Sequence, residues 1–137
     1  MGHQSNINLL DNHRVLHFAS SQMQELLTLS PVLQKPSSIY LGTYQQLTKS
    51  ESSLAAKLAD YFKADAASEQ FVLYRSNSEL YVIGGSERAV LFGVYQFGET
   101  YLGLHWLYPK EKAVYIEPIN SFDSLEISSF KPVMERR

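Results

Sequence analysis

Cysteine is absent from this chain of 137 residues, and its absence removes several kinds of chemistry. Without thiols there is no disulfide framework, no thiolate metal site and no cysteine nucleophile. The chain also lacks a basic run, and its net charge of −2 does not fit a surface that binds nucleic acid or an anionic membrane. No apolar run approaches the roughly 20 residues of a membrane-spanning helix. We therefore expect no nucleic-acid partner and no membrane partner.

Length and the two ends of the chain predict its organisation. A chain of this size forms one domain, and folding removes about two thirds of its unfolded surface from water. Residues 1–5 have neither the charged nor the apolar part of a signal peptide and look like a scar of cloning. We expect an accessory domain over residues 6–128 and the start of a linker over residues 129–137. The sequence assigns no cellular compartment, and a secreted or periplasmic parent protein is compatible with the sequence.

Three segments have the spacing of amphipathic helices. Residues 13–29 repeat apolar side chains at steps of three and four and end before Pro31. Thr48 and Glu51 form the pattern of a capping box, which predicts a second helix from there to about residue 62. A third helix is predicted from Glu87 to about residue 102. Residues 44–46 are expected to be a connection.

Apolar and β-branched runs between these helices predict strands. They are residues 7–10, 38–43, 69–75, 79–83, 104–107 and 113–116. The turn Ser76-Asn77-Ser78 is short enough to make an antiparallel hairpin of the strands beside it, and residues 109–112 form the polar loop of a second hairpin. The tail from residue 119 has no clear period. This order of elements predicts an α/β (α+β) domain with a mixed β-sheet and with helices packed mainly on one face.

The stretch Tyr81–Pro109 is the centre of this organisation. It begins as an apolar strand, and Gly84-Gly85 allows the backbone to turn sharply after it. Ser86 is placed to cap the following helix, and Glu87 complements the positive end of the helix dipole. Gly103 is expected to end the helix in the left-handed conformation.

This stretch resembles the N-terminal, non-catalytic domain of α-glucuronidase-like glycoside hydrolases of families 67 and 115. The second domain of β-N-acetylhexosaminidases is a more distant relative. The family pattern is a strand, a polar turn, a helix of the form Gly-x-Leu-Tyr-Gly-Val-Tyr-x-Phe-Leu-Glu, and then Leu-Gly-x-x-Trp. The matching positions are Leu91, Phe92, Gly93, Val94, Tyr95, Phe97, Glu99, Leu102, Gly103 and Trp106, with Phe92 replacing the usual Tyr. The chain departs from the pattern at Ala89-Val90, Gly98 and His105.

The resemblance implies a β-N-acetylhexosaminidase domain 2-like fold, which is broadly zincin-like. It also implies a parent enzyme of bacterial polysaccharide degradation, whose acid and base belong to a catalytic barrel in the same polypeptide. The run Pro132-Val133-Met134-Glu135-Arg136 is similar to the sequence where such a domain leads into the barrel. We therefore expect an excised domain, and an ordinary C-terminus is the alternative.

Because the implied fold is of the zinc-protease type, we consider the histidines as metal ligands. His13 and His17 have the i, i+4 spacing of two zinc ligands. However, no acidic residue lies between them and the sequence shows no third ligand. We expect two partly exposed helical histidines, and neither a metal nor another cofactor.

No catalytic residue is expected in this chain. Ser86 lacks the surroundings of a nucleophile elbow or a phosphate loop, and its role as a helix cap explains it. Glycoside hydrolysis needs two carboxylates that face each other across the glycosidic bond. We expect no such pair here, because Glu87, Glu99, Glu111 and Glu117 are isolated carboxylates in the sequence.

The candidate substrate contacts are Trp106, His105, Tyr108 and Arg88. An indole can stack on the apolar face of a sugar ring, while His105 and Tyr108 can hydrogen-bond to its hydroxyl groups. Alternatively, Trp106 packs on the sheet or on the barrel. Arg88 either meets an anionic sugar or pairs with a carboxylate of the protein.

The sequence therefore predicts an accessory or scaffold domain of a carbohydrate-active glycoside hydrolase, with the barrel as its partner and an oligosaccharide as its ligand. The alternative is a stand-alone module that binds a glycan or a protein. Activity would belong to the parent protein and not to this domain alone.

Overall fold

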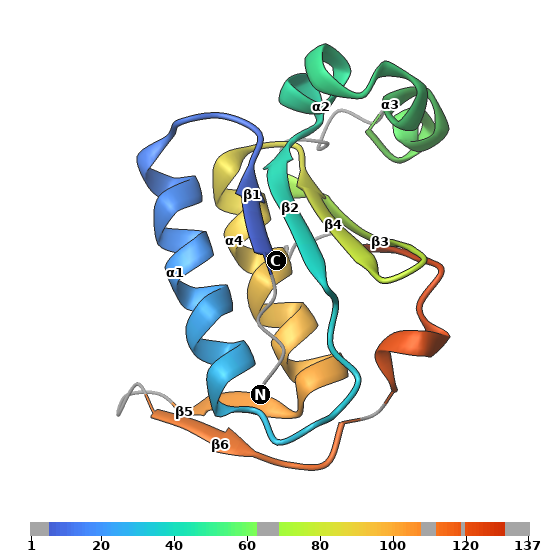
Figure 1. Ribbon diagram of the computed structural model, residues 1–137. Helices are drawn as coiled ribbons and strands as arrows, with labels where there is room; N and C mark the ends of the chain where they lie inside the picture. The colour runs from blue at the N-terminus through green and yellow to red at the C-terminus, as the bar shows by residue number, and fades with distance from the viewer. Residues whose placement is uncertain (1–5, 63–68, 108–111, 119, 131–137) are drawn as a thin grey trace, which may run out of the picture.

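The domain is built on a five-stranded mixed sheet (Figure 1). The computed structural model describes residues 6–62, 69–107, 112–118 and 120–130. In their order across the sheet, the strands are β1 (Asn6–Leu9), β2 (Ser38–Thr43), β4 (Glu79–Gly84), β3 (Phe71–Ser76) and β7 (Ile127–Phe130). The first three are parallel to one another, and β3 is antiparallel to both β4 and β7. The predicted mixed sheet is confirmed.

Two long helices cover one face of this sheet. They are α1 (Arg14–Leu29) and α4 (Glu87–Phe97), which lie side by side (Figure 1). Their apolar stripes pack on alternate strand residues, as the side-chain period of two in a strand requires. The fully buried members of this core include Leu16, Met23, Leu26, Ile39, Leu41, Leu73, Leu80, Val90, Val94 and Phe97. The prediction that helices pack mainly on one face is confirmed.

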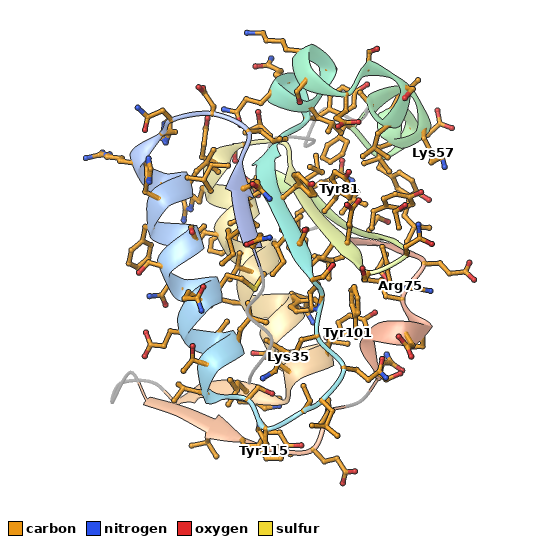
Figure 2. The ribbon with its side chains drawn as sticks, viewed as in Figure 1. Lys35, Lys57, Arg75, Tyr81, Tyr101 and Tyr115 are labelled. Atoms are coloured by element: carbon orange, nitrogen blue, oxygen red, sulfur yellow. The ribbon has the colours of Figure 1, made fainter. Side chains whose placement is uncertain are left out.

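Side chains hydrogen-bond to the backbone groups at both ends of α1. The helix begins after His13, whose Nδ1 accepts the Val15 backbone N–H at 3.1 Å. At the other end, Lys35 Nζ donates to the carbonyl oxygens of Leu27 and Ser30 at 2.8 and 2.9 Å. Figure 2 shows Lys35 at this lower end of the domain. A cation is favourable here because the last carbonyls of a helix have no partner inside it.

Three short helical segments cover part of the opposite face. They are α2 (Tyr44–Ser50), α3 (Ser52–Leu58) and the 3-10 helix η1 (Ala59–Phe62). Their buried side chains form a second apolar cluster with the sheet: Leu47, Ala55, Leu58, Val72, Tyr81 and Ile83. Tyr81 also stacks on Tyr40 of the neighbouring strand, with ring centroids 4.7 Å apart. Figure 2 labels Tyr81 on this side of the sheet and Lys57 on α3 above it.

The predicted capping box at Thr48 and Glu51 is wrong, because the helix begins at Tyr44. Thr43, the last residue of β2, is the cap: its Oγ1 accepts the Gln46 backbone N–H at 3.1 Å, and Gln46 Oε1 accepts the Thr43 backbone N–H at 2.9 Å. Thr48 lies inside α2, and Glu51 separates α2 from α3 with a non-helical backbone (φ −140°, ψ 73°). The predicted connection before Leu47 is thus the first helical turn.

The third predicted helix agrees with the structure at both ends. Ser86 caps α4 by accepting the Ala89 backbone N–H at 3.2 Å. A π-helical turn, η3 (Gly98–Leu102), continues α4, and Gly103 ends it with φ 73°. Within the described residues, neither this nor any other helix has the length and apolarity needed to cross a membrane.

A separate antiparallel pair of strands lies at the lower end of the domain (Figure 1). It consists of β5 (Leu104–Leu107) and β6 (Lys112–Tyr115), which the sequence predicts with a small shift of β6. The Ile116 backbone N–H donates to the Gly103 carbonyl at 2.6 Å and joins the pair to the end of η3.

The end of the described chain returns to the sheet. A 3-10 helix, η4 (Phe122–Ser124), leads into β7, so residues 129 and 130 belong to the sheet. The predicted cloning scar at residues 1–5 and the rest of the predicted linker, 131–137, lie outside the described residues.

Candidate functional site

The structure brings two of the four predicted substrate contacts onto one hairpin. His105 and Trp106 are consecutive in β5, paired with Val114 and Ala113 of β6, and His105 is half-buried. Tyr108 lies outside the described residues. Tyr115, at the end of β6, is 43% exposed and is labelled at the lower end of the domain in Figure 2.

Arg88 lies away from this hairpin. It is exposed in the first turn of α4, and its Cζ lies 5.4 Å from the centre of the Phe92 ring one helical turn later. Arg88 and Phe92 also line a small pocket of about 110 Å³. The helical segment from Glu87 to Leu102 separates this end of α4 from β5 by a length on the order of 20 Å. The structure therefore does not bring Arg88 to the hairpin.

A polar hollow lies at the opposite end of the sheet from the hairpin. It occupies about 320 Å³ outside the carboxyl ends of the three parallel strands. It is lined by Asp11, Thr43, Gln45, Gln46, Lys49, Gly85, Ser86 and Glu87. In Figure 1 this is the upper edge of the sheet, where β1, β2 and β4 end.

The path of the chain produces this hollow. The connections after β1 and β4 lead to helices on one face of the sheet, whereas the connection after β2 leads to α2 on the other (Figure 1). Neighbouring strands whose connections leave in opposite directions form a topological switch point. In open α/β sheets, ligands bind in the crevice that such a point leaves. The position of the hollow thus has the geometry of a binding site.

Gln46 is the central side chain of the hollow. Its Nε2 donates to Asp11 Oδ2 at 3.3 Å and to Glu87 Oε2 at 3.1 Å. Its Oε1 is held by the Thr43 backbone N–H, so the amide has a fixed orientation. Two carboxylates, one in the loop after β1 and one in the first turn of α4, are therefore held within hydrogen-bonding distance of one nitrogen atom.

The two histidines considered as metal ligands have different surroundings. His13 is the cap of α1, and its Nε2 lies 4.0 Å from Glu87 Oε2. His17 lies in the first turn of α1, and its Nε2 forms an exposed hydrogen bond of 2.6 Å with Oδ1 of Asn12, a residue of the preceding loop. Among the described residues, no three His, Cys, Asp or Glu side chains are grouped to hold a metal ion.

The hollow can accept and donate hydrogen bonds, and its surroundings do not favour acid–base hydrolysis. Asp11 and Gln45 are exposed, and the lining is mostly polar. A glycosidase pair acts from two sides of a bond in a site that excludes bulk water. Here both carboxylates accept from the same Gln46 amide group. The arrangement therefore suits reversible binding of a polar ligand.

Sequence reasoning missed this hollow and described Glu87 as isolated. The structure corrects that description, because Glu87 shares Gln46 with Asp11 and lies near His13. A signal was available: polar residues follow each of three predicted strands within one to four positions, and the carboxyl ends of parallel strands meet at one edge. Recognising it requires knowing which strands are neighbours and parallel.

Comparison with known proteins finds similarity to solved structures but to no family model and no curated sequence. A solved structure of a GH138 enzyme targeting pectin rhamnogalacturonan II is similar to it over 69% of this chain, with 16% sequence identity and a TM-score of 0.48. The similar part is 10% of that enzyme's chain. The likeness is thus to a small part of a larger glycoside hydrolase, of a family other than 67 and 115.

Proposed function

We propose that this chain is a non-catalytic accessory domain of an α-glucuronidase-like glycoside hydrolase, with a catalytic barrel of the same polypeptide as its partner. The observation that carries this proposal is the local structure of the stretch that bears the sequence resemblance. Strand β4, the turn at Gly84-Gly85, helix α4 capped by Ser86, and the left-handed Gly103 follow one another in the order of the family pattern.

The β5–β6 hairpin is the part of the domain that we propose to meet the substrate or the barrel. In this proposal the Trp106 indole stacks on a sugar ring, while His105 and Tyr108 hydrogen-bond to its hydroxyl groups. At the end of β6 and directly after it, Tyr115 and Ile116 are 43% and 56% exposed. Neighbouring exposed apolar side chains are typical of contact surfaces.

Arg88 would act apart from these residues. Arg88 lies far from the hairpin along α4. A contact between Arg88 and an anionic sugar would therefore form a separate site on the domain. The exposed guanidinium and the Phe92 ring beneath it are compatible with such a contact. Replacement of Arg88 should therefore leave binding at the hairpin unchanged.

A glycan titration tests the role of the hairpin. Calorimetry of the purified chain with glucuronic-acid-decorated xylan oligosaccharides should give saturable binding, which Trp106→Ala abolishes. Phe18→Ala is the matched control, because Phe18 is an aromatic residue that is 50% exposed on α1. If the folded wild-type chain binds none of these oligosaccharides, the proposed substrate contact is wrong and only the scaffold role remains.

The gene that encodes the parent protein tests the scaffold role. A barrel with paired carboxylates encoded after Arg137 would support the accessory domain. The second candidate is a stand-alone module that binds a glycan or a protein, and the exposed apolar residues Tyr115 and Ile116 favour it. A stop codon directly after Arg137 would support this module instead.

A further inference from the structure

We propose that the polar hollow at the carboxyl ends of β1, β2 and β4 is a second carbohydrate site, which binds a single neutral or amino sugar. The choice of a sugar among polyhydroxylated ligands rests on the proposed function, whereas the site itself rests on the geometry below. The site is separate from Trp106, because the hollow and the β5–β6 hairpin lie at opposite ends of the sheet (Figure 1).

The size of the hollow limits the ligand. Its volume of about 320 Å³ is at the lower end of the range found for small-molecule sites. One pyranose ring with its hydroxyl groups fits this space, and a longer oligosaccharide would have to extend into solvent. The hollow also lies at the switch point of the sheet, where α/β folds bind ligands.

The lining side chains have unused hydrogen-bonding capacity. An ionised carboxylate can accept about four hydrogen bonds. Asp11 accepts from the Asn12 backbone N–H at 2.8 Å and from Gln46, and Glu87 accepts from Gln46. Both side chains therefore still offer acceptors to hydroxyl groups of a ligand, and Lys49 offers a donor. Because the Thr43 backbone N–H fixes Gln46, this side chain loses little conformational freedom on binding.

The charge of the hollow selects among sugars. Two carboxylates, Asp11 and Glu87, and one ammonium group, Lys49, line the hollow. His13 Nε2 lies 4.0 Å from Glu87 Oε2. A uronate would bring a third carboxylate next to these two, which is unfavourable. A neutral sugar avoids this repulsion, and the ammonium group of an amino sugar gains an attraction. No described lining residue is aromatic, so we expect weak binding with a Kd in the range of about 1 mM.

Nuclear magnetic resonance of the full chain can detect such weak binding. We would titrate methyl β-xyloside, glucosamine and glucuronic acid separately, and follow the backbone amide signals of Gly85, Ser86 and Glu87. Saturable shifts of these signals are expected with the first two sugars, and weaker shifts with glucuronic acid. Tighter binding of glucuronic acid, or no shift of these amides with any sugar, would overturn the proposal.

Two conservative variants test the assigned side chains. Glu87→Gln and Asp11→Asn should each raise the Kd about tenfold or more, since a hydrogen bond to a charged group is replaced by a neutral one. Glu99→Gln, an exposed carboxylate on η3, is the matched control and should leave the Kd unchanged. Unchanged Kd values in both hollow variants would overturn the assignment.

Trp106→Ala separates this proposal from the proposed function. The variant should retain sugar binding in the hollow while losing oligosaccharide binding at the hairpin. If Trp106→Ala abolishes all binding and the hollow variants change nothing, the hairpin is the site and the second carbohydrate site is refuted. If only the hollow variants lose binding, the second site stands and the substrate contact of Trp106 fails.

Discussion

Gln46 joins the beginning of α2 to the beginning of α4. Its Oε1 accepts the Thr43 backbone N–H at 2.9 Å, and its Nε2 donates to Glu87 Oε2 at 3.1 Å. The same amide therefore completes the capping box of one helix and positions a carboxylate in the first turn of another. Local helix capping and the shape of the polar hollow depend on the same residue.

Removal of the Thr43 hydroxyl should destabilise the domain. Thr43→Val keeps the volume of this buried side chain but removes the acceptor of the Gln46 N–H, and we expect the unfolding free energy to fall by about 1 kcal/mol. Thr48→Val is the control, because Thr48 is exposed inside α2 and should change stability by less than about 0.5 kcal/mol. Urea denaturation measures both. Equal losses would contradict the assignment of the cap to Thr43.

A side chain at position 103 should be costly for two separate reasons. Gly103 has φ 73°, and an added Cβ would collide with the Ile116 carbonyl oxygen, a backbone atom. Asn77 has a similar left-handed φ of 58° in an exposed hairpin turn. We expect Asn77→Ala to lower the unfolding free energy by about 1 kcal/mol, and Gly103→Ala to lower it by at least twice as much. Thermal unfolding compares the two, and similar midpoints would exclude the collision.

The core on the long-helix face should depend strongly on Phe97. This side chain is fully buried, with its ring centre 5.3 Å from that of Tyr101 and 6.1 Å from that of Phe122. Phe97→Ala should cost about 3–5 kcal/mol, because it leaves a cavity among these rings. Phe92→Ala on the same helix removes a ring that is 45% exposed and should cost about 1 kcal/mol or less. Calorimetric unfolding would show whether the two losses differ in this order.

Stability should fall at alkaline pH partly through Tyr81. Burial, and then the charge of Glu79, raise the pKa of Tyr81 to about 12, above its ordinary value of 10.0. Since the folded-state pKa is the higher one, the contribution is complete below pH 10 and is lost as the pH rises from 10 to about 12. The difference in unfolding free energy between the wild type and Tyr81→Phe should therefore change across this window. A constant difference would show that Tyr81 does not titrate there.

The sequence predicts those parts of the fold that depend on neighbouring residues. The bounds of β2 and the start of α4 follow from an apolar run and from Ser86 as a cap. The end of the helical segment formed by α4 and η3 is predicted from Gly103, since no other residue type adopts the left-handed backbone conformation so readily. The turn at Asn77 likewise needs only the residues of its own hairpin.

The location of the second helix shows where local patterns become ambiguous. Thr43 with Gln46 and Thr48 with Glu51 both have the spacing of a capping box. The structure uses the first pair, because α2 must start directly at the end of β2 for Leu47 to reach the apolar cluster under it. That choice depends on packing against the sheet, which the spacing does not contain.

The candidate site depends on contacts between distant residues. Asp11, Gln46 and Glu87 each follow a different strand, and they meet only because β1, β2 and β4 are adjacent and parallel. The pairing of β7 with β3 is a contact of the same kind, because the tail has no period of its own. The hairpin, in contrast, places His105 beside Trp106 through their adjacency in the sequence.

The order of strands in the sheet also has a consequence for how the chain folds. The turn at Asn77 brings β3 and β4 together at little entropic cost, and α4 follows β4 directly. The pairings of β1 with β2 and of β3 with β7 close much longer loops, so they lose more chain entropy before they gain contacts. We therefore expect the β3–β4–α4 unit to form the folding nucleus, with both edge strands docking late and fraying first.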